Sequence, residues 1–220
     1  MSAESEGRLS RENAGDLTFS EQYNGPDPLL DAARALSHEN GLASVSQTTA
    51  STLTLLARLL RPVAAVEVGT GAGTSTLALL RGMPNAGILT SIDTNSTAQA
   101  AARDLIDMAG IRHSRLRLMS GRAEDVLQRL APGAYDMVFV DSEPTNLERM
   151  IEPALRLLDT HGLLVIHQTL LKGGVADPVD RSPRTQAARG LLNRLAGQER
   201  LERVLLPIGQ GLLMLQKTLR

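Results

Sequence analysis

The chain has 220 residues, of which 42% are apolar and 21% charged, and its formal net charge is −1. Its length allows a sizeable core, while the lack of a basic stripe and of Trp argues against a nucleic-acid partner. The absence of cysteine excludes disulfides, thiolate zinc sites and cysteine nucleophiles. Because the sequence has neither an apolar signal segment nor a run of about 18 apolar residues, we expect a cytoplasmic protein without membrane contact.

The N-terminal part of the sequence divides into an arm and the start of a domain. Residues 1–26 are polar and lack hydrophobic periodicity, so we interpret them as a flexible arm that precedes a single domain over residues 27–220. Asp27 and Pro28 are typical of a helix N-terminus, with a capping side chain and then proline at the first helical position. A second helix is predicted to begin at Ser46 and to end before the next proline.

From residue 63 onward, β-rich runs alternate with helical patterns. The predicted strands cover Val63–Val68, Gly87–Ile92, Arg115–Met119, Tyr135–Val140 and Gly162–His167. The predicted helices cover Gly73–Arg81, Ser96–Ala109, Ala123–Leu130, Pro144–Leu158 and about Arg184–Ala196. This alternation predicts an α/β fold, a Rossmann-like, doubly wound and mostly parallel seven-stranded sheet with helices on both faces. Two apolar runs joined by Gly209-Gln210-Gly211 predict a C-terminal antiparallel hairpin.

The segment VEVGTGAGTSTLALL, Val66–Leu80, contains a glycine-rich turn between the first predicted strand and its helix. Gly69, Gly71 and Gly73 are spaced G-x-G-x-G, and the absence of a following lysine excludes a triphosphate-binding loop. The third position of the dinucleotide fingerprint holds Thr74 instead of glycine. The turn alone would also fit a tight connection without a ligand.

Two acids beside this turn narrow the choice of ligand. Glu67 lies near the end of an apolar strand, where an ionised side chain needs a cationic or hydrogen-bond-donating partner. Asp93 ends the second strand, a position from which acids in such folds bind ribose hydroxyls. Either acid alone could be a solvated strand end. Together with the glycine turn they favour a nucleoside with a zwitterionic amino-acid tail, such as S-adenosylmethionine.

Seven segments resemble the class I S-adenosylmethionine-dependent O-methyltransferases, and more narrowly the catechol and caffeoyl-CoA O-methyltransferase group with its small actinobacterial relatives. These segments are VSQTTASTLTLLARLL, VEVGTGAGTSTLALL, LTSIDT, AGIRHSRLRLMSGRAEDVL, YDMVFVDSEP, GGVADP and LLPIGQGLLMLQK. The resemblance implies methyl transfer to a hydroxyl of a small-molecule acceptor and a homodimeric protein.

The resemblance also implies contacts with S-adenosylmethionine at matching positions. These are Val45 as pocket lining, Glu67 at the methionine amino group, the backbone of Gly69, Thr70 and Gly71, Ser75 near the carboxylate, Asp93 and Thr94 at the ribose, Arg122, Ala123 and Glu124 around the adenine, and Asp141 near the sulfonium methyl. The ligand is therefore expected to lie across the carboxyl ends of the first strands.

The chain departs from the metal-dependent members of this group at two places. Those members carry Asp-x-x-Lys after the fourth strand and Asp-Asn after the fifth, whereas this chain has Asp141 followed by Pro144, and then His167 and Gln168. Because Mg²⁺ prefers carboxylate and water oxygens, we expect the usual magnesium site to be absent. If a transition ion bound, its ligands would be Asp141, His167 and Gln168.

Asp141 and His167 are the candidate catalytic residues. Three interpretations of His167 stay open: a metal ligand, a strand-end histidine hydrogen-bonded to backbone or to Asp141, and a general base, a role that histidine often takes near neutral pH. The altered motifs also leave a catalytically silent S-adenosylmethionine-binding module as an alternative. An NAD-dependent oxidoreductase is a weaker one, because the fingerprint glycine is missing. The sequence does not predict the acceptor, since specificity lies in loops above the strand ends.

Overall fold

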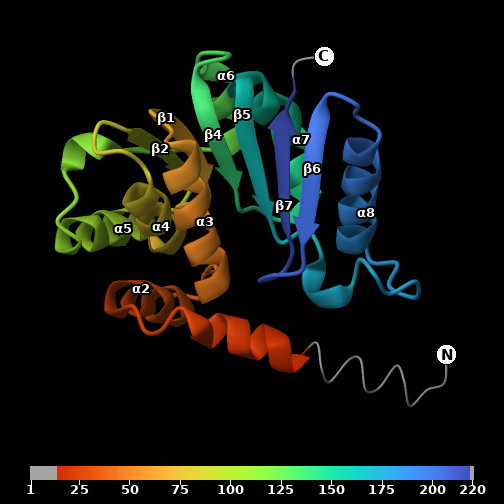
Figure 1. Cartoon of the computed structure of the whole chain (residues 1–220), viewed down its shortest axis with the longest axis horizontal. Helices are drawn as coiled ribbons and strands as arrows, with labels where there is room; N and C mark the ends of the chain where they lie inside the picture. Colours follow the sequence, from red (N-terminus) through yellow and green to blue (C-terminus); the bar gives the residue numbers. More distant parts are fainter. Residues whose placement is uncertain (1–13, 219–220) are drawn as a thin grey trace.

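The computed structural model of the chain describes residues 14–218, which include a seven-stranded sheet of order β3-β2-β1-β4-β5-β7-β6 (Figure 1). The strands are β1 Ala64–Val68, β2 Ile88–Asp93, β3 Leu116–Ser120, β4 Tyr135–Val140, β5 Leu158–His167, β6 Leu201–Leu206 and β7 Leu212–Lys217. Neighbouring strands among β1 to β5 are parallel, whereas β7 runs antiparallel to both β5 and β6. The predicted α/β fold with its C-terminal antiparallel hairpin is confirmed.

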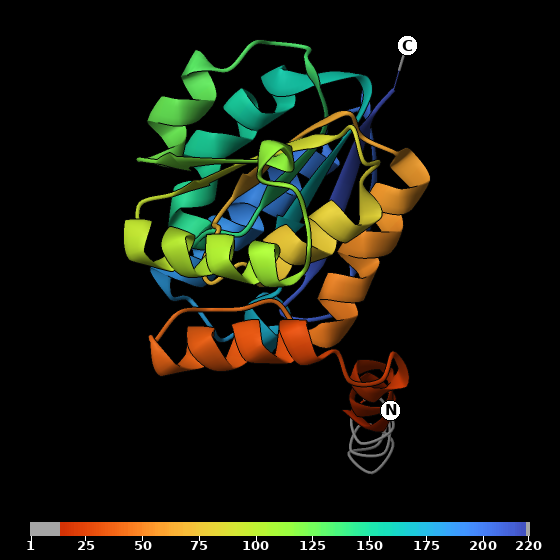
Figure 2. The same ribbon diagram turned by 90° about the vertical axis from the view of Figure 1, so that its left-hand side faces the viewer.

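Helices cover both faces of the sheet (Figure 2). One layer contains α2 Pro28–Glu39, α3 Gln47–Leu60, α4 Thr74–Gly82 and α5 Ser96–Met108, and the other contains α6 Ala123–Arg129, α7 Pro144–Leu157 and α8 Pro183–Ala196. Phe139 packs into the first layer, whereas Val138 and Val140 pack into the second. Because successive side chains of a strand point to opposite faces, a strand buried on both sides is apolar throughout, as β4 is.

The predicted helix starts are confirmed by their capping contacts. The Asp27 side chain accepts from the Leu30 N–H at 3.2 Å, and the Ser46 hydroxyl accepts from the Thr49 N–H at 3.3 Å. Such caps satisfy N–H groups that have no partner inside the helix. Between residues 14 and 218, no helix combines the length and the apolarity that crossing a membrane requires.

The start of β5 differs from the prediction. The strand begins at Leu158 instead of Gly162, and the preceding helix α7 ends at Leu157. The pairing with β4 shifts register after Leu158, and the Asp159 carboxylate accepts from the His161 N–H at 3.0 Å within the irregular stretch. A polar bulge therefore interrupts the apolar pattern, which is why the sequence revealed only the second half of the strand.

The segment predicted as an arm contains a helix over residues 14–23, and residues 1–13 lie outside the described part of the chain. The Glu21 carboxylate of this helix accepts from the Ser46 hydroxyl at 2.7 Å and from the Thr48 N–H at 3.0 Å. A carboxylate is favoured at a helix N-terminus, here that of α3. The contact joins distant parts of the sequence, so local periodicity could not predict it.

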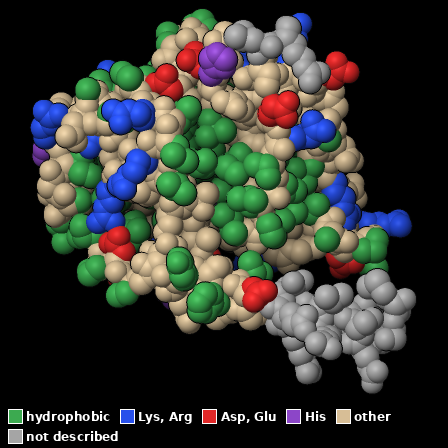
Figure 3. All heavy atoms as spheres, viewed as in Figure 1, with side chains coloured by type: hydrophobic (Ala, Val, Ile, Leu, Met, Phe, Trp, Pro, Cys, Tyr) green, Lys and Arg blue, Asp and Glu red, His purple; other side chains and the backbone are tan. Residues whose placement is uncertain are grey.

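One face of the molecule carries exposed apolar side chains. Leu55 and Leu59 of α3 and Val204 of β6 are 57%, 72% and 45% exposed. Figure 3 shows apolar side chains gathered over this face, on which α3 and the C-terminal strands lie.

Candidate functional site

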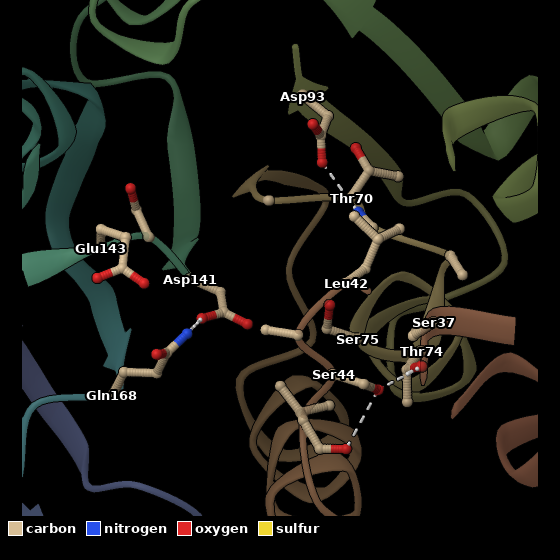
Figure 4. Close-up of a pocket in the computed structure, with 16 residues that line it drawn as sticks. Ser37, Leu42, Ser44, Thr70, Thr74, Ser75, Asp93, Asp141, Glu143 and Gln168 are labelled. Atoms are coloured by element: carbon tan, nitrogen blue, oxygen red, sulfur yellow. Dashed lines mark hydrogen bonds between the residues drawn. The ribbon is translucent and has the colours of Figure 1, made fainter. Parts of the chain in front are cut away.

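Two adjoining cavities lie at the carboxyl ends of β1, β2 and β4, and both are lined by Gly69, Asp93 and Asp141. The first, of about 210 Å³, is also lined by Val45, Thr70, Gly71, Ser75 and Gln168 (Figure 4). The second, of about 490 Å³, is also lined by Thr94, Arg122, Ala123 and Glu124. Every residue implied to contact the cofactor, except the buried Glu67, therefore lines one of the two cavities.

The glycine turn after β1 is fixed by close packing and by hydrogen bonds. Gly69 has φ +94°, and a Cβ there would lie 2.4 Å from the Asp141 carbonyl oxygen. The Gly71 N–H donates to Asp93 Oδ2 at 2.9 Å, which ties the turn to the end of β2. Gly73 has φ +94° and caps α4, where a Cβ would lie 2.9 Å from that of Ala102. Only glycine fits such approaches at positive φ.

Glu67 is fully buried and uses only one of its carboxyl oxygens within the described structure. Its Oε2 accepts from the hydroxyls of Thr76 and Ser91, both at 2.6 Å, whereas Oε1 is buried without a hydrogen-bond partner. Burial raises the pKa of Glu67 to about 7; the negative charge of Asp141 adds to this, and the hydroxyls of Ser75, Ser91 and Thr76 oppose it. The unpaired oxygen is suited to a hydrogen-bond donor that carries positive charge.

The second cavity has a different polar lining. Asp93 accepts from the Asn95 N–H at 2.9 Å through Oδ1, which orients its carboxylate at the end of β2. After the end of β3, Arg122 Nε donates to Glu124 Oε1 at 3.1 Å, and this bond lowers the pKa of the Glu124 carboxyl. The cavity therefore presents two carboxyl groups, which can accept from the hydroxyl or amino groups of a nucleoside.

At the end of β4, Asp141 is held by two nitrogen donors. Its Oδ1 accepts from His167 Nδ1 at 3.1 Å and from Gln168 Nε2 at 2.7 Å (Figure 4 shows the latter). Arg184 Nη2 donates to Gln168 Oε1 at 3.2 Å, and Arg184 Nε lies 3.1 Å from Glu143 Oε2. Because a guanidinium can only donate, the Gln168 amide must turn its oxygen to Arg184 and its NH₂ to Asp141.

His167 is enclosed on its other side. The residue is 2% exposed, lines neither cavity, and has an Nε2 that is buried without a partner in the described structure. A Cβ on Gly209, in the β6–β7 hairpin, would lie 3.0 Å from this nitrogen. Of the three interpretations that the sequence left open, these contacts match a histidine hydrogen-bonded to Asp141.

The three residues that could have formed the metal site do not fit the oxygen ligand set that Mg²⁺ prefers. Gln168 presents N–H donors to Asp141, and an amide nitrogen in this orientation cannot ligate a cation. His167 Nδ1 is hydrogen-bonded to the same carboxylate, and its Nε2 is enclosed by the hairpin. In residues 14–218, no group of three or more His, Cys, Asp or Glu side chains is arranged to hold a metal ion.

Comparison with known proteins decides the family. The family model described as O-methyltransferase matches residues 27–218. The chain belongs to the O-methyltransferase family. A relative from Mycobacterium sp. (strain KMS), assigned as an O-methyltransferase, is 41% identical over 197 residues, which are 90% of each chain. The expected family is confirmed, and it gives the oxidoreductase alternative no support.

Solved structures agree with this O-methyltransferase assignment. A protein from Corynebacterium glutamicum with 32% identity matches with a TM-score of 0.86, over 92% of this chain and 95% of that chain. The O-methyltransferase TomG of Streptomyces achromogenes, involved in tomaymycin synthesis and solved with S-adenosylmethionine, has 28% identity and a TM-score of 0.81 over 95% and 98% of the two chains. An O-methyltransferase from Bacillus cereus, solved with S-adenosylhomocysteine, has 25% identity and a TM-score of 0.81 over 93% and 97%.

The groups that orient the acids of this O-methyltransferase were not predicted from its sequence. Ser91 gave a usable signal, because a serine inside a strand that is buried on both faces needs a hydrogen-bond partner. Thr76 gave a weaker signal, because a threonine in the first turn of a helix is common. Arg184 gave none, because only the fold brings the start of α8 to the end of β5.

Proposed function

We propose that this O-methyltransferase transfers the methyl group of S-adenosylmethionine to an oxygen of a small-molecule acceptor without using a divalent ion. The observation that carries the proposal is the buried Glu67, whose Oε1 has no partner in the described structure and whose neighbours in the chain, Val68 and Gly69, line the cavity that also contains Asp93. The ammonium group of the cofactor would face Glu67, and its carboxylate would face Ser75 and the N-terminus of α4. Asp93 would bind the ribose. The relatives solved with S-adenosylmethionine or S-adenosylhomocysteine support this assignment.

The adenine would occupy the second cavity, between Arg122, Ala123 and Glu124, with Thr94 beside the ribose. In the first cavity, Val45 and the backbone of Gly69, Thr70 and Gly71 would pack against the methionine part. Asp141, which lines both cavities, would then lie beside the sulfonium methyl. The acceptor would approach from the side of Gln168 and Glu143.

The chemistry is an in-line displacement. The acceptor oxygen forms a bond to the methyl carbon, the carbon–sulfur bond breaks, S-adenosylhomocysteine leaves, and the hydroxyl proton of the acceptor passes by way of Asp141 to solvent. Since the sulfonium is already a good leaving group, alignment is the main task of the protein, and positioning can contribute about 7–11 kcal/mol. Asp141 Oδ2, which has no hydrogen bond in the described structure, would accept from the acceptor hydroxyl. His167 would orient Asp141.

Cofactor binding is tested by titration calorimetry of the full chain with S-adenosylmethionine and with S-adenosylhomocysteine. We expect saturable binding of both, and no binding at millimolar concentration would refute the proposal. A panel of phenols and catechols is then assayed for methylation with EDTA, Mg²⁺ or Mn²⁺. We expect a product whose rate EDTA does not reduce. A product that requires the added metal would refute metal independence, and binding without any product would favour the silent cofactor-binding module.

The homodimer that the resemblance implies is a separate part of the proposal. Leu55 and Leu59 of α3 and Val204 of β6 are exposed, and Figure 3 shows apolar side chains over the face on which α3 and the C-terminal strands lie, which offers a surface for a second copy. Light scattering after gel filtration should give the mass of a dimer. Leu59→Glu should shift the protein toward the monomer, and a wild-type monomer at high concentration would contradict this part.

A further inference from the structure

A chain of buried hydrogen bonds runs from Gln99 through Thr70 and Ser91 to Glu67. At the Gln99 end, the surrounding acceptors determine which group donates. The Gln99 Nε2 atom lies 3.3 Å from Thr70 Oγ1, 3.4 Å from the Ser91 carbonyl oxygen and 3.2 Å from the Met119 carbonyl oxygen. Carbonyl oxygens can only accept, so the NH₂ group of Gln99, not its oxygen, must face this side. Thr70 therefore accepts a hydrogen bond from Gln99.

The remaining bonds of the chain follow from this one. Thr70 Oγ1 and Ser91 Oγ are 2.7 Å apart, and Ser91 Oγ is 2.6 Å from Glu67 Oε2. An ionised Glu67 can only accept, so the Ser91 hydroxyl donates to it and the Thr70 hydroxyl donates to Ser91. Gln99 favours this direction, because it supplies a donor to Thr70 and leaves the Thr70 proton available for Ser91. Glu67 Oε2 is thus an acceptor whenever the carboxyl group is ionised.

Thr76 also donates to Oε2 of the ionised carboxylate, so this oxygen accepts from two hydroxyls. When both hydroxyls keep this direction in the neutral state, the proton of Glu67 sits on Oε1, the oxygen that is buried without a partner in residues 14–218. A ligand that binds Oε1 through an N–H donor has to displace this proton.

The charged groups around Glu67 do not supply such a donor. Asp141, at the end of β4, acts on Glu67 with a negative charge. Asp93, at the end of β2, accepts from the Gly71 N–H. On α4, which contributes Thr76, the basic residue is Arg81 in the last turn, and it is paired with Asp27. The negative charge of Asp141 disfavours the ionised form of Glu67 until a cation arrives.

We propose that Ser91, Thr70 and Gln99 are positioning residues that leave only Oε1 of Glu67 open to the cofactor, so that binding of the S-adenosylmethionine ammonium expels the proton of Oε1. This inference rests on the proposed function and deepens it. The neutral carboxyl group and the ammonium become an ion pair, and one proton passes to solvent. Burial, which raises the pKa of Glu67 to about 7, ensures that the free protein carries this proton in mildly acidic solution.

The test is calorimetric titration of the full chain with S-adenosylhomocysteine between pH 5.5 and pH 7.5, in pairs of buffers that differ in ionisation enthalpy. The difference between the two buffers gives the number of protons released. Wild type should release close to one proton at pH 5.5 and fewer as the pH rises, and Kd should weaken about tenfold per pH unit below the pKa of Glu67. Glu67→Gln should release none of these protons, which isolates the contribution of Glu67 from that of the ligand.

Ser91→Ala removes a donor to the ionised carboxylate, so it should raise the pKa of Glu67 and shift the pH profile of Kd upward. Ser91→Thr keeps a hydroxyl and should restore the wild-type profile. Thr90→Val is the matched control, because it removes a buried hydroxyl from the same strand but not from the chain of hydrogen bonds. It should leave both Kd and proton release as in wild type, with thermal unfolding used to compare the stability of all variants.

Binding of S-adenosylhomocysteine to wild type with no proton release at pH 5.5 would overturn the inference and leave the proposed function intact. A Ser91→Ala variant that weakens binding by one constant factor across the pH range would overturn the positioning role as well. Absence of any binding between pH 5.5 and 7.5 would instead refute the proposed function, and the inference with it.

Discussion

The two sides of the strand-end site satisfy their polar groups in different ways. On the β1–β2 side, Glu67 keeps one buried oxygen without a hydrogen bond in the described structure, although its other oxygen accepts from two hydroxyls. On the β4–β5 side, Asp141, His167 and Gln168 bind one another, and Arg184 extends the group to Glu143. The first side keeps a buried acceptor for a charged ligand, whereas the Asp141 carboxylate of the second is already held, and the unpartnered His167 Nε2 there is enclosed by the β6–β7 hairpin in the described structure.

This difference links the β1–β2 side to cofactor binding and the β4–β5 side to methyl transfer. An unpaired buried oxygen costs free energy until a ligand satisfies it, which links Glu67 to cofactor affinity. A carboxylate already held by nitrogen donors gains less from a metal ion, which links Asp141 to the orientation of the acceptor. Substitutions on the two sides should therefore change different measured quantities.

The largest effect is expected where the two sides touch, at Gly69. Gly69→Ala would place a Cβ 2.4 Å from the Asp141 carbonyl oxygen at φ +94°, and backbone hydrogen bonds at 2.9 Å from Gly69 to Ile92 and from Asp141 to Val68 oppose relaxation. We expect a loss of about 3 kcal/mol or more in the free energy of unfolding, and loss of cofactor binding. Gly110→Ala is the control, since it has φ +68° but no atom within 4 Å, and should cost about 1 kcal/mol. If both variants lost the same free energy of unfolding, measured with urea, the predicted clash with Asp141 would be contradicted.

A second prediction concerns pH and the β1–β2 side alone. The pKa of Glu67 is raised from 4.5 to about 7 in the folded protein, so between these values the folded state binds more protons than the unfolded state. The free energy of unfolding should therefore fall as the pH rises from about 4.5 to 7, by at most about 3 kcal/mol. Glu67→Gln should remove this fall, so the variant gains on wild type between pH 5 and pH 8. The prediction would be contradicted if the free energy of unfolding, measured with urea, changed by the same amount between pH 5 and pH 8 in wild type and in the variant.

The β4–β5 side can be tested by building the oxygen ligands that it lacks. His167→Asp combined with Gln168→Asn replaces the two nitrogen donors on Asp141 by a carboxylate and a shorter amide. We expect this double variant to bind Mn²⁺ at least about tenfold more tightly than wild type, because hard cations prefer oxygen ligands. Paramagnetic resonance of free Mn²⁺ measures this directly. If wild type bound Mn²⁺ as tightly as the variant is expected to, the native residues would already form a metal site.

The smallest effect is expected at Arg184, whose side chain is 44% exposed in its pair with Glu143. Arg184→Ala should change stability by no more than about 1 kcal/mol, because exposed pairs contribute little. Cofactor affinity should stay unchanged, while turnover of an acceptor found in the panel falls several-fold, since Gln168 loses its fixed orientation. Arg194→Ala, on the same helix as Arg184, breaks an exposed pair with Glu148 of α7; it is the matched control and should leave turnover unchanged. A loss of cofactor affinity in Arg184→Ala would contradict the separation of the two sides.

Local patterns of the sequence were enough to predict most of the fold and one side of the site. The cap at Ser46, the glycine spacing after β1 and the continuous apolar run of β4 are each visible within a few consecutive residues. The acids Glu67 and Asp93 were found because each follows a strand pattern directly. Although distant residues fix the glycine turn and cover β4, the residue types that these positions require form local patterns, which the sequence shows by itself.

The tertiary structure decided which oxygen of each acid is free. Ser91 and Thr76 saturate one oxygen of Glu67, and His167 and Gln168 saturate one oxygen of Asp141. The direction of a hydrogen bond depends on which donors and acceptors the fold brings together from distant segments. No periodicity or spacing encodes that pairing, so the sequence could predict the acids but not how they are held.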